Sequence, residues 1–209
     1  MEFKIEITEV YGLNKSIIAS GNAMRTEMDD NCGDFSSNDL KRATKVGKTN
    51  LGEGHDYFLN GIIVQFDLYA PLYMWKQIQR YHFFDFISSQ STMHRLTKFK
   101  VSECCVEDTD EVILARYQVL LDEYNSFDEE YADVLEKKAV QALKKKKWRK
   151  LVAALPCGFV LGATMTTNYR QLKTIYFQRK NHKLDEWHQF CTWCESLPHF
   201  KELILKEND

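Results

Sequence analysis

LPCGFVLGATMTTNYRQLKTIYFQR, residues 155–179, is the stretch around which the rest of the chain can be ordered. Its Leu155-Pro156 pair ends the preceding element, because proline has no N–H to donate and restricts the residue before it. Asn168 predicts the N-cap of a helix, and Gln171 stands at the capping-box position three residues later. The sequence therefore indicates a break, then small residues at 158, 162 and 163 that allow close backbone approach, then a helix.

The predicted helix carries an arginine on its apolar stripe. Leu172, Ile175 and Tyr176 recur at helical spacing, and Arg179 falls on the same side. Arg170 points to a different face. An arginine on an apolar stripe is paired, reaches water with its head group, or meets an anionic ligand. A structural ion pair and a ligand contact are therefore both open for Arg179.

Length and composition suit one domain spanning residues 1–209. Hydrophobic residues make up 44% of the chain and aromatic residues 13%, which is enough for a sizeable core. The net charge of −2 gives no overall attraction to nucleic acid or to an acidic membrane. No apolar run is long enough to span a membrane, and the start of the chain is too charged for a signal peptide. We expect a cytoplasmic protein with neither a nucleic-acid nor a membrane partner.

The cysteines and histidines do not predict a metal site. Six cysteines are scattered along the chain, which is not a disulfide framework. Cys191 and Cys194 have CxxC spacing, but they lie in a helical pattern and no second pair accompanies them. The motifs HExxH, GxGxxG, GxxxxGK[ST] and GxSxG are all absent. The common zinc, dinucleotide, P-loop and serine-hydrolase signatures are thus excluded.

Hydrophobic periodicity predicts both strands and helices. The clearest strand covers residues 61–69, where alternate residues are apolar. We expect further strands over 2–11 and 99–106, and helices over 13–24, 37–49, 72–87, 108–154 with a joint at 125–126, 169–179 and 184–197. The rest of 25–53 is a polar loop of a length that is usually functional or disordered.

Two polar segments have more than one interpretation. SSQSTMHR, residues 88–95, is either a plain loop, a helix cap or a group of hydroxyls and N–H groups for an anion. KKKKWRK, residues 144–150, is typical of a solvated helix end near the negative pole of its dipole. A phosphate-binding or RNA-binding patch is the alternative for this basic run.

Polar residues at the ends of the expected elements follow one another in an informative order. Gly54-His55 precedes the strand, Ala70-Pro71 ends it, and Gln77 and Arg80 follow. Leu155-Pro156 is then followed by Asn168, Arg170 and Arg179. In this order and spacing the chain resembles the flavin-dependent thymidylate synthases, the ThyX family. The two blocks cover about a third of the chain directly, and any single residue in them is not specific.

The resemblance implies a ThyX-like α+β fold with an antiparallel or mixed sheet packed against helices and a long helical middle region. It also implies bound FAD, with methylenetetrahydrofolate and NADPH as co-substrates in the conversion of dUMP to dTMP. Catalysis is assigned to Arg179, which would hold the uracil and stabilise negative charge on its ring. A homotetramer with sites between subunits belongs to the same expectation. The resemblance assigns cofactor binding to His55, Arg80, His82, Asn168 and Arg170, and substrate binding to Gln77, Ser91, Arg95 and Arg179.

The chain departs from the family signature RHRxxSxNExSxR. Arg80 matches its start, but Tyr81 and His82 replace the His-Arg that follows, and the Asn-Glu and the last Arg are missing. Ser91 matches the later serine when one inserted residue is allowed. Arg95 can then supply the phosphate contact of the missing arginine, as can His94 or the lysines before Leu155.

Three hypotheses follow from this comparison. The first is a flavin-dependent thymidylate synthase. The second is an enzyme that alkylates or hydroxymethylates another pyrimidine nucleotide, which the altered signature favours. The third is a non-catalytic nucleotide-binding or flavin-binding relative, which the missing Glu and Arg favour and the retained polar residues oppose.

Overall fold

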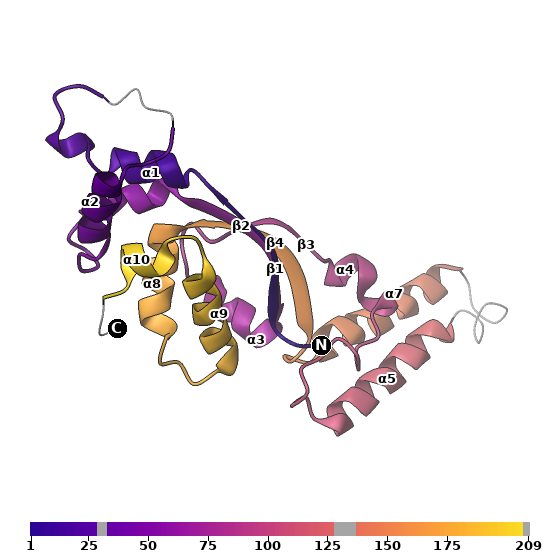
Figure 1. The fold of residues 1–209 in the computed structure, drawn as a ribbon. Helices are drawn as coiled ribbons and strands as arrows, with labels where there is room; N and C mark the ends of the chain where they lie inside the picture. The colour runs from indigo at the N-terminus through magenta and orange to yellow at the C-terminus, as the bar shows by residue number, and fades with distance from the viewer. Residues whose placement is uncertain (29–32, 128–136, 207–209) are drawn as a thin grey trace. The chain divides into compact units, whose positions relative to one another are not determined.

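The computed structural model describes residues 1–28, 33–127 and 137–206. Within these residues the chain has an α+β fold with one four-stranded antiparallel sheet, in the order β1-β2-β4-β3 (Figure 1). The expected fold class is therefore confirmed. The strands are β1 (Lys4–Tyr11), β2 (Ile63–Pro71), β3 (Asp85–Ser89) and β4 (Val160–Asn168).

Each predicted helix has a counterpart in the structure, although some are shorter than predicted, and two further short α-helices among the described residues were not predicted. No helix in the described part of the chain is long and apolar enough to cross a membrane. The α-helices are α1 (Leu13–Ala19), α2 (Ser37–Gly47), α3 (Leu72–Ile78), α4 (Thr92–Arg95), α5 (Glu111–Asn125), α7 (Lys137–Ala154), α8 (Tyr169–Arg179), α9 (Asp185–Ser196) and α10 (Phe200–Ile204), and the short 3-10 turns are η1 (Asn22–Met24), η2 (Tyr57–Gly61) and η3 (Leu96–Lys98).

Two compact units share these elements. The first unit contains Met1–Lys4, Tyr69–Gln77 and Ser89–Ala163, and the second contains Ile5–Leu68, Ile78–Ser88 and Thr164–Asp209. The chain passes from one unit to the other within β1, β2, α3, β3 and β4. The prediction of a single domain stays a prediction.

A small hydrophobic core holds the first unit together. In it α5 and α7 pack against each other, and the buried core residues are Leu96, Val101, Cys105, Tyr117, Leu121, Leu151 and Phe159. Asp110 caps α5 by accepting the backbone N–H groups of residues 112 and 113. Ser126 is the C-cap of α5, at the predicted joint. The apolar positions 131, 134 and 135 of the predicted helix lie outside the described residues.

Aromatic packing dominates the second unit. Phe66 of β2 contacts the rings of Phe84 and Trp193, and Trp193 in turn contacts Phe190 of α9. Helix α8 packs on α9 and on η2, while α2 packs on α1 and α10. Ser36 caps α2 in a reciprocal capping box with Asp39. This unit positions the candidate site, because η2, the start of α8 and the turn before β3 all belong to it.

The two strands β2 and β4 are built differently. Along β2, alternate residues from Val64 to Ala70 are buried, as predicted from the sequence. β4 was not predicted as a strand, because its glycine and alanine weaken the strand pattern. Gly162 is required there, since a Cβ atom would come within 2.7 Å of the Tyr69 ring.

The predicted helix over 72–87 is wrong beyond Ile78. Phe83 takes a left-handed conformation with φ 56°, and the next residue, Phe84, buries its ring against Phe66 and Phe190. The chain then joins the sheet as β3. A dense aromatic run gives no helix stop signal, so here tertiary packing overrides local propensity.

Two further expectations are corrected. The predicted strand over 99–106 is a series of turns whose only ladder contact among the described residues is an isolated bridge between Cys105 and Phe159. The apolar spacing of α5 also misleads, because Val112 and Val119 are exposed while Tyr117 and Leu121 face the core.

Candidate functional site

A pocket of about 570 Å³ lies in the second unit where η2 meets the start of α8. Three residues predicted to bind a cofactor, namely His82, Asn168 and Arg170, line it together. Its other lining residues are Tyr57, Asn60, Ile63, Phe83, Gln171 and Thr174. Residues far apart in the sequence thus converge at one pocket, which spacing alone could not show.

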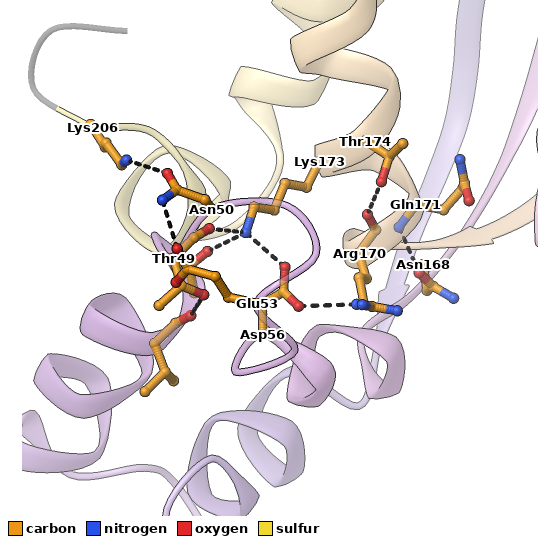
Figure 2. A network of polar contacts seen from close by, with 12 residues as sticks. Thr49, Asn50, Glu53, Asp56, Asn168, Arg170, Gln171, Lys173, Thr174 and Lys206 are labelled. Atoms are coloured by element: carbon orange, nitrogen blue, oxygen red, sulfur yellow. Dashed lines mark hydrogen bonds and ion pairs between the residues drawn. The ribbon is translucent and has the colours of Figure 1, made fainter.

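The junction of β4 and α8 places two of these side chains. Asn168 ends the strand and caps the helix, and its Oδ1 atom accepts the backbone N–H of Gln171 at 2.8 Å, as the sequence predicted (Figure 2). The amide nitrogen of Asn168 is then the group that can donate to a ligand. Arg170 lies on the first turn of α8, on the side of the pocket, while Leu172 and Ile175 face the core. The prediction that Arg170 and the apolar stripe lie on different faces of this helix is confirmed.

Two aromatic rings are exposed at the pocket. Tyr57 is 60% exposed and Phe83 is 68% exposed, so both rings are accessible to a ligand. The left-handed backbone of Phe83 is held by Thr167, whose hydroxyl donates to the Phe83 carbonyl oxygen at 2.7 Å. A strained non-glycine residue that presents an apolar ring to a pocket is typical of a ligand-binding position. Exposed rings of this kind suit the flat face of an aromatic ligand.

A buried ionic network lies behind Arg170. Asp56 is 1% exposed and has a cation on each oxygen: Oδ1 accepts from Arg170 Nε at 3.0 Å and Oδ2 accepts from Lys173 Nζ at 2.7 Å. The ammonium group of Lys173 also donates to the carbonyl oxygens of Gly47 and Thr49, at 2.9 and 2.7 Å. All three of its hydrogens therefore have acceptors. Figure 2 shows the Asp56 carboxylate between the two cationic groups.

The network keeps Asp56 ionised. Burial by itself would raise the pKa of Asp56, but the hydrogen bonds from Lys173 and Arg170 outweigh burial and hold this pKa below its usual value. The Arg170 guanidinium carbon also lies 4.0 Å from the centre of the Tyr57 ring. Arg170 is thus fixed by a carboxylate on its edge and a ring against its face.

Arg179 lies outside the lining of this pocket. Its side chain is 7% exposed, its Nε atom donates to the Tyr81 hydroxyl at 2.6 Å, and its guanidinium carbon lies 4.6 Å from the Trp187 ring centre. It does not line the pocket that contains Arg170. Burial of the His182 ring, with the nearby Arg179 charge, lowers the pKa of His182. The predicted catalytic role of Arg179 stays a prediction.

The other predicted site residues are distributed over both units. His55 and Arg80 are exposed residues of the second unit that do not line the pocket. Gln77, Ser91 and Arg95 belong to the first unit. Ser91 caps α4 by accepting the backbone N–H of residue 94 at 3.2 Å, which is the capping interpretation of the serine-rich segment. A role of these residues in substrate binding stays a prediction.

Among the residues at or behind the pocket, Tyr57, Phe83, Asp56 and Lys173 carry much of its chemistry and were not predicted from the sequence. A signal existed for Lys173, because it lies next to Leu172 and three residues before Tyr176, within the apolar arc of α8. A buried lysine requires an acceptor nearby. The sequence offers no comparable signal for Asp56, which precedes an ordinary turn.

The cysteine pair of α9 lies within the packing of the second unit. Cys191 and Cys194 are buried, and burial raises the pKa of Cys191 to about 11 and that of Cys194 well above its usual value. The raised pKa values favour the neutral thiol over the thiolate, which is the form that binds zinc. The described residues contain no cluster of three or more potential metal ligands.

The fold is that of the flavin-dependent thymidylate synthases. A ThyX from Helicobacter pylori, solved in complex with FAD and dUMP, superposes with a TM-score of 0.68 at 16% identity over 97% of this chain and 98% of the other. A second structure of Helicobacter pylori ThyX with FAD and dUMP gives a TM-score of 0.65 at 15% identity over 98% of each chain.

This chain is also similar to a solved structure of an enzyme that is not called a thymidylate synthase. The UMP/dUMP methylase PolB from Streptomyces cacaoi, bound to 5-Br dUMP, superposes with a TM-score of 0.62 at 12% identity over 97% of this chain and 92% of the other. No protein-family model matches the sequence, and no curated protein matches it either. The likeness thus lies in the fold.

We expect Tyr81→Phe to destabilise the protein through Arg179. The variant keeps the ring but removes the hydroxyl that accepts the Arg179 Nε–H, and such a bond to a charged group contributes about 1.5–3 kcal/mol. Urea unfolding measures the change. Tyr11→Phe is the matched control, because that hydroxyl bonds Glu9 at the exposed surface of β1, and its loss should stay within about 0.5 kcal/mol. Equal effects of the two changes would contradict the assigned bond.

Proposed function

We propose that this protein is an FAD-dependent enzyme that methylates dUMP to dTMP, with methylenetetrahydrofolate and NADPH as co-substrates. The observation that carries the proposal is the pocket that joins His82, Asn168 and Arg170 with two exposed rings. The fold supports it, since structures with this fold have been solved with FAD and dUMP. A cytoplasmic homotetramer with sites between subunits forms part of the proposal.

The residues of the pocket fit a flavin nucleotide. The rings of Tyr57 and Phe83 suit a flat aromatic system, and the guanidinium group of Arg170 suits a phosphate. The Asn168 amide and the His82 ring add hydrogen-bonding groups. Bound FAD supplies hydride transfer, while the protein supplies binding, orientation and electrostatics.

Arg179 is assigned to the pyrimidine in this proposal. Its planar fork can hydrogen-bond a uracil ring and stabilise negative charge that grows on it. The Tyr81 hydroxyl and the Trp187 ring hold the guanidinium group in one orientation. An orientation fixed before the substrate arrives needs no rearrangement during the reaction.

A second candidate function is methylation or hydroxymethylation of another pyrimidine nucleotide. Two observations favour it: Tyr81 and His82 replace the signature His-Arg, and a UMP/dUMP methylase shares the fold. Both candidates require a flavin and a pyrimidine nucleotide. They differ in the base or sugar of the substrate.

We expect the purified protein to show a flavin absorption spectrum, either as isolated or after FAD is added. A protein that stays colourless and acquires no FAD would overturn the proposed function. The flavin-loaded enzyme is then incubated with methylenetetrahydrofolate, NADPH and one of dUMP, UMP or dCMP. Mass analysis should show that dUMP is converted to dTMP. A methylated or hydroxymethylated product from UMP or dCMP, with no product from dUMP, would select the second candidate.

A further inference from the structure

The carboxylate of Asp56 has no role in the proposed chemistry, yet the protein buries it at a cost. Taking a charge out of water is unfavourable unless the charge is paired and hydrogen-bonded. Here the Asp56 carboxylate forms ion pairs with two cations on successive turns of α8, Arg170 and Lys173. The arrangement links the surface of the pocket to the interior of the second unit.

We propose that Asp56 is a positioning residue that fixes the Arg170 guanidinium group as the phosphate-binding group of this pocket. The inference rests on the proposed function, because it assigns part of the nucleotide to Arg170. Its basis is the contact geometry: Asp56 holds the Nε edge of Arg170 at 3.0 Å, and Tyr57 lies against the guanidinium face at 4.0 Å. Both the edge and the plane of the group are therefore defined.

Net charge shows which ligand this arrangement suits. Asp56 contributes one negative charge, and Arg170 and Lys173 contribute one positive charge each. Lys173 is fully buried and uses its three hydrogens within the protein. The remaining positive charge is thus presented by Arg170, which is 30% exposed and lines the pocket. A guanidinium group with one edge occupied binds a phosphate oxygen through its terminal nitrogens.

Lys173 has a different task from Asp56. It ties the carbonyl oxygens of Gly47 and Thr49 to α8 and compensates the buried carboxylate from the core side. It does not line the pocket that contains Arg170. Loss of Lys173 should therefore lower stability and leave the orientation of Arg170 to Asp56 and Tyr57.

The phosphate has two possible sources, FAD and dUMP, and binding measurements separate them. Dissociation constants of FAD, riboflavin and dUMP are measured for the wild-type protein, Arg170→Ala, Lys173→Met, the double variant Asp56→Asn/Lys173→Met and the triple variant that adds Arg170→Ala to it. The double variant removes both buried charges, so it avoids an unpaired ammonium group. Urea unfolding of each variant reports stability separately.

We expect the ligand whose phosphate meets Arg170 to bind about tenfold to hundredfold more weakly in Arg170→Ala and in the double variant. Lys173→Met should stay within about twofold of wild type, and adding Arg170→Ala to the double variant should cost no more than about another twofold. Riboflavin, which lacks a phosphate, should bind all variants alike. A double variant that binds FAD and dUMP as tightly as wild type, while Arg170→Ala does not, would overturn the role of Asp56.

Failure of the proposed function gives a different result. In that case the wild-type protein binds neither FAD nor dUMP, and the same variants are titrated with inorganic pyrophosphate. Weaker pyrophosphate binding in Arg170→Ala and in the double variant, but not in Lys173→Met, supports the positioning role on its own. Equal binding by the wild-type protein and all of the variants, or no binding by wild type, overturns it.

Discussion

The Arg179→Ala variant is expected to lose nucleotide-dependent turnover and to keep its fold. If Arg179 stabilises charge on the pyrimidine, its loss removes a preorganised donor, which costs about 10²–10³-fold in kcat. The side chain is buried between Tyr81 and Trp187, so its orientation does not depend on the ligand. Turnover of dUMP by the flavin-loaded variant, followed by product mass, measures the effect.

Two further variants test whether the loss of turnover comes from the guanidinium group of Arg179. Arg179→Lys keeps the charge but lacks the planar fork, so we expect activity between those of wild type and Arg179→Ala. Arg116→Ala is the matched control, because Arg116 is exposed on α5 and should leave turnover unchanged. Turnover by Arg179→Ala equal to that of wild type, in a folded and flavin-loaded protein, would remove Arg179 from the reaction.

The position of Arg179 also shows what helical spacing can predict. The stripe of Leu172, Ile175 and Tyr176 correctly placed this arginine on the buried face of α8. Spacing could not provide its neighbours, since Tyr81 is nearly a hundred positions away and lies at a signature position that differs from the family. In this structure that tyrosine contacts Arg179 directly. The departure from the signature is thus accompanied by a contact that only the fold reveals.

The elements with regular periodicity were predicted well, and those decided by tertiary packing were not. β2 and α8 each bury one face, so alternation and helical spacing identify them. β3 is exposed along its whole length, and β4 contains glycine and alanine, so neither has a clear pattern. The helix that Asn168 caps and that carries Arg170 was consequently predicted from the sequence, whereas the strand that ends at Asn168 was not.

The pocket was only half predictable for a similar reason. Asn168 and Arg170 follow from a capping motif and from family spacing. Tyr57 and Phe83 depend on turns, whose geometry is set by contacts such as the hydrogen bond to the Phe83 carbonyl oxygen. Asp56 is polar and close to two glycines with positive φ, which suggests an exposed turn, and the structure buries it instead. A buried charge is invisible in sequence when its partners lie more than a hundred positions away.

Asp56→Ala is expected to cost about 3–5 kcal/mol of unfolding free energy at neutral pH, because it leaves the buried ammonium group of Lys173 without a counter-charge. Urea unfolding measures this loss. The double variant Asp56→Asn/Lys173→Met removes both charges together. It should therefore lose less unfolding free energy than the sum of the losses in Asp56→Asn and in Lys173→Met. Glu103→Ala is the control: its ion pair with Lys100 is exposed, and such pairs contribute about 0–1 kcal/mol. Similar losses for Asp56→Ala and Glu103→Ala would contradict the network.

The cost of Asp56→Ala should also shrink in acid. The pKa of Asp56 is lowered in the folded protein, where hydrogen bonds from Lys173 and Arg170 outweigh the opposite effect of burial, whereas an unfolded aspartate titrates near pH 3.9. A carboxyl group with a lowered pKa contributes stability that is fully present above the unfolded pKa and is lost as the pH falls through the folded pKa. The free-energy difference between wild type and Asp56→Ala should therefore stay constant from pH 7 to about pH 5 and decrease below about pH 4. A difference that does not change down to the acid limit of folding would mean that Asp56 contributes through packing and not through its charge.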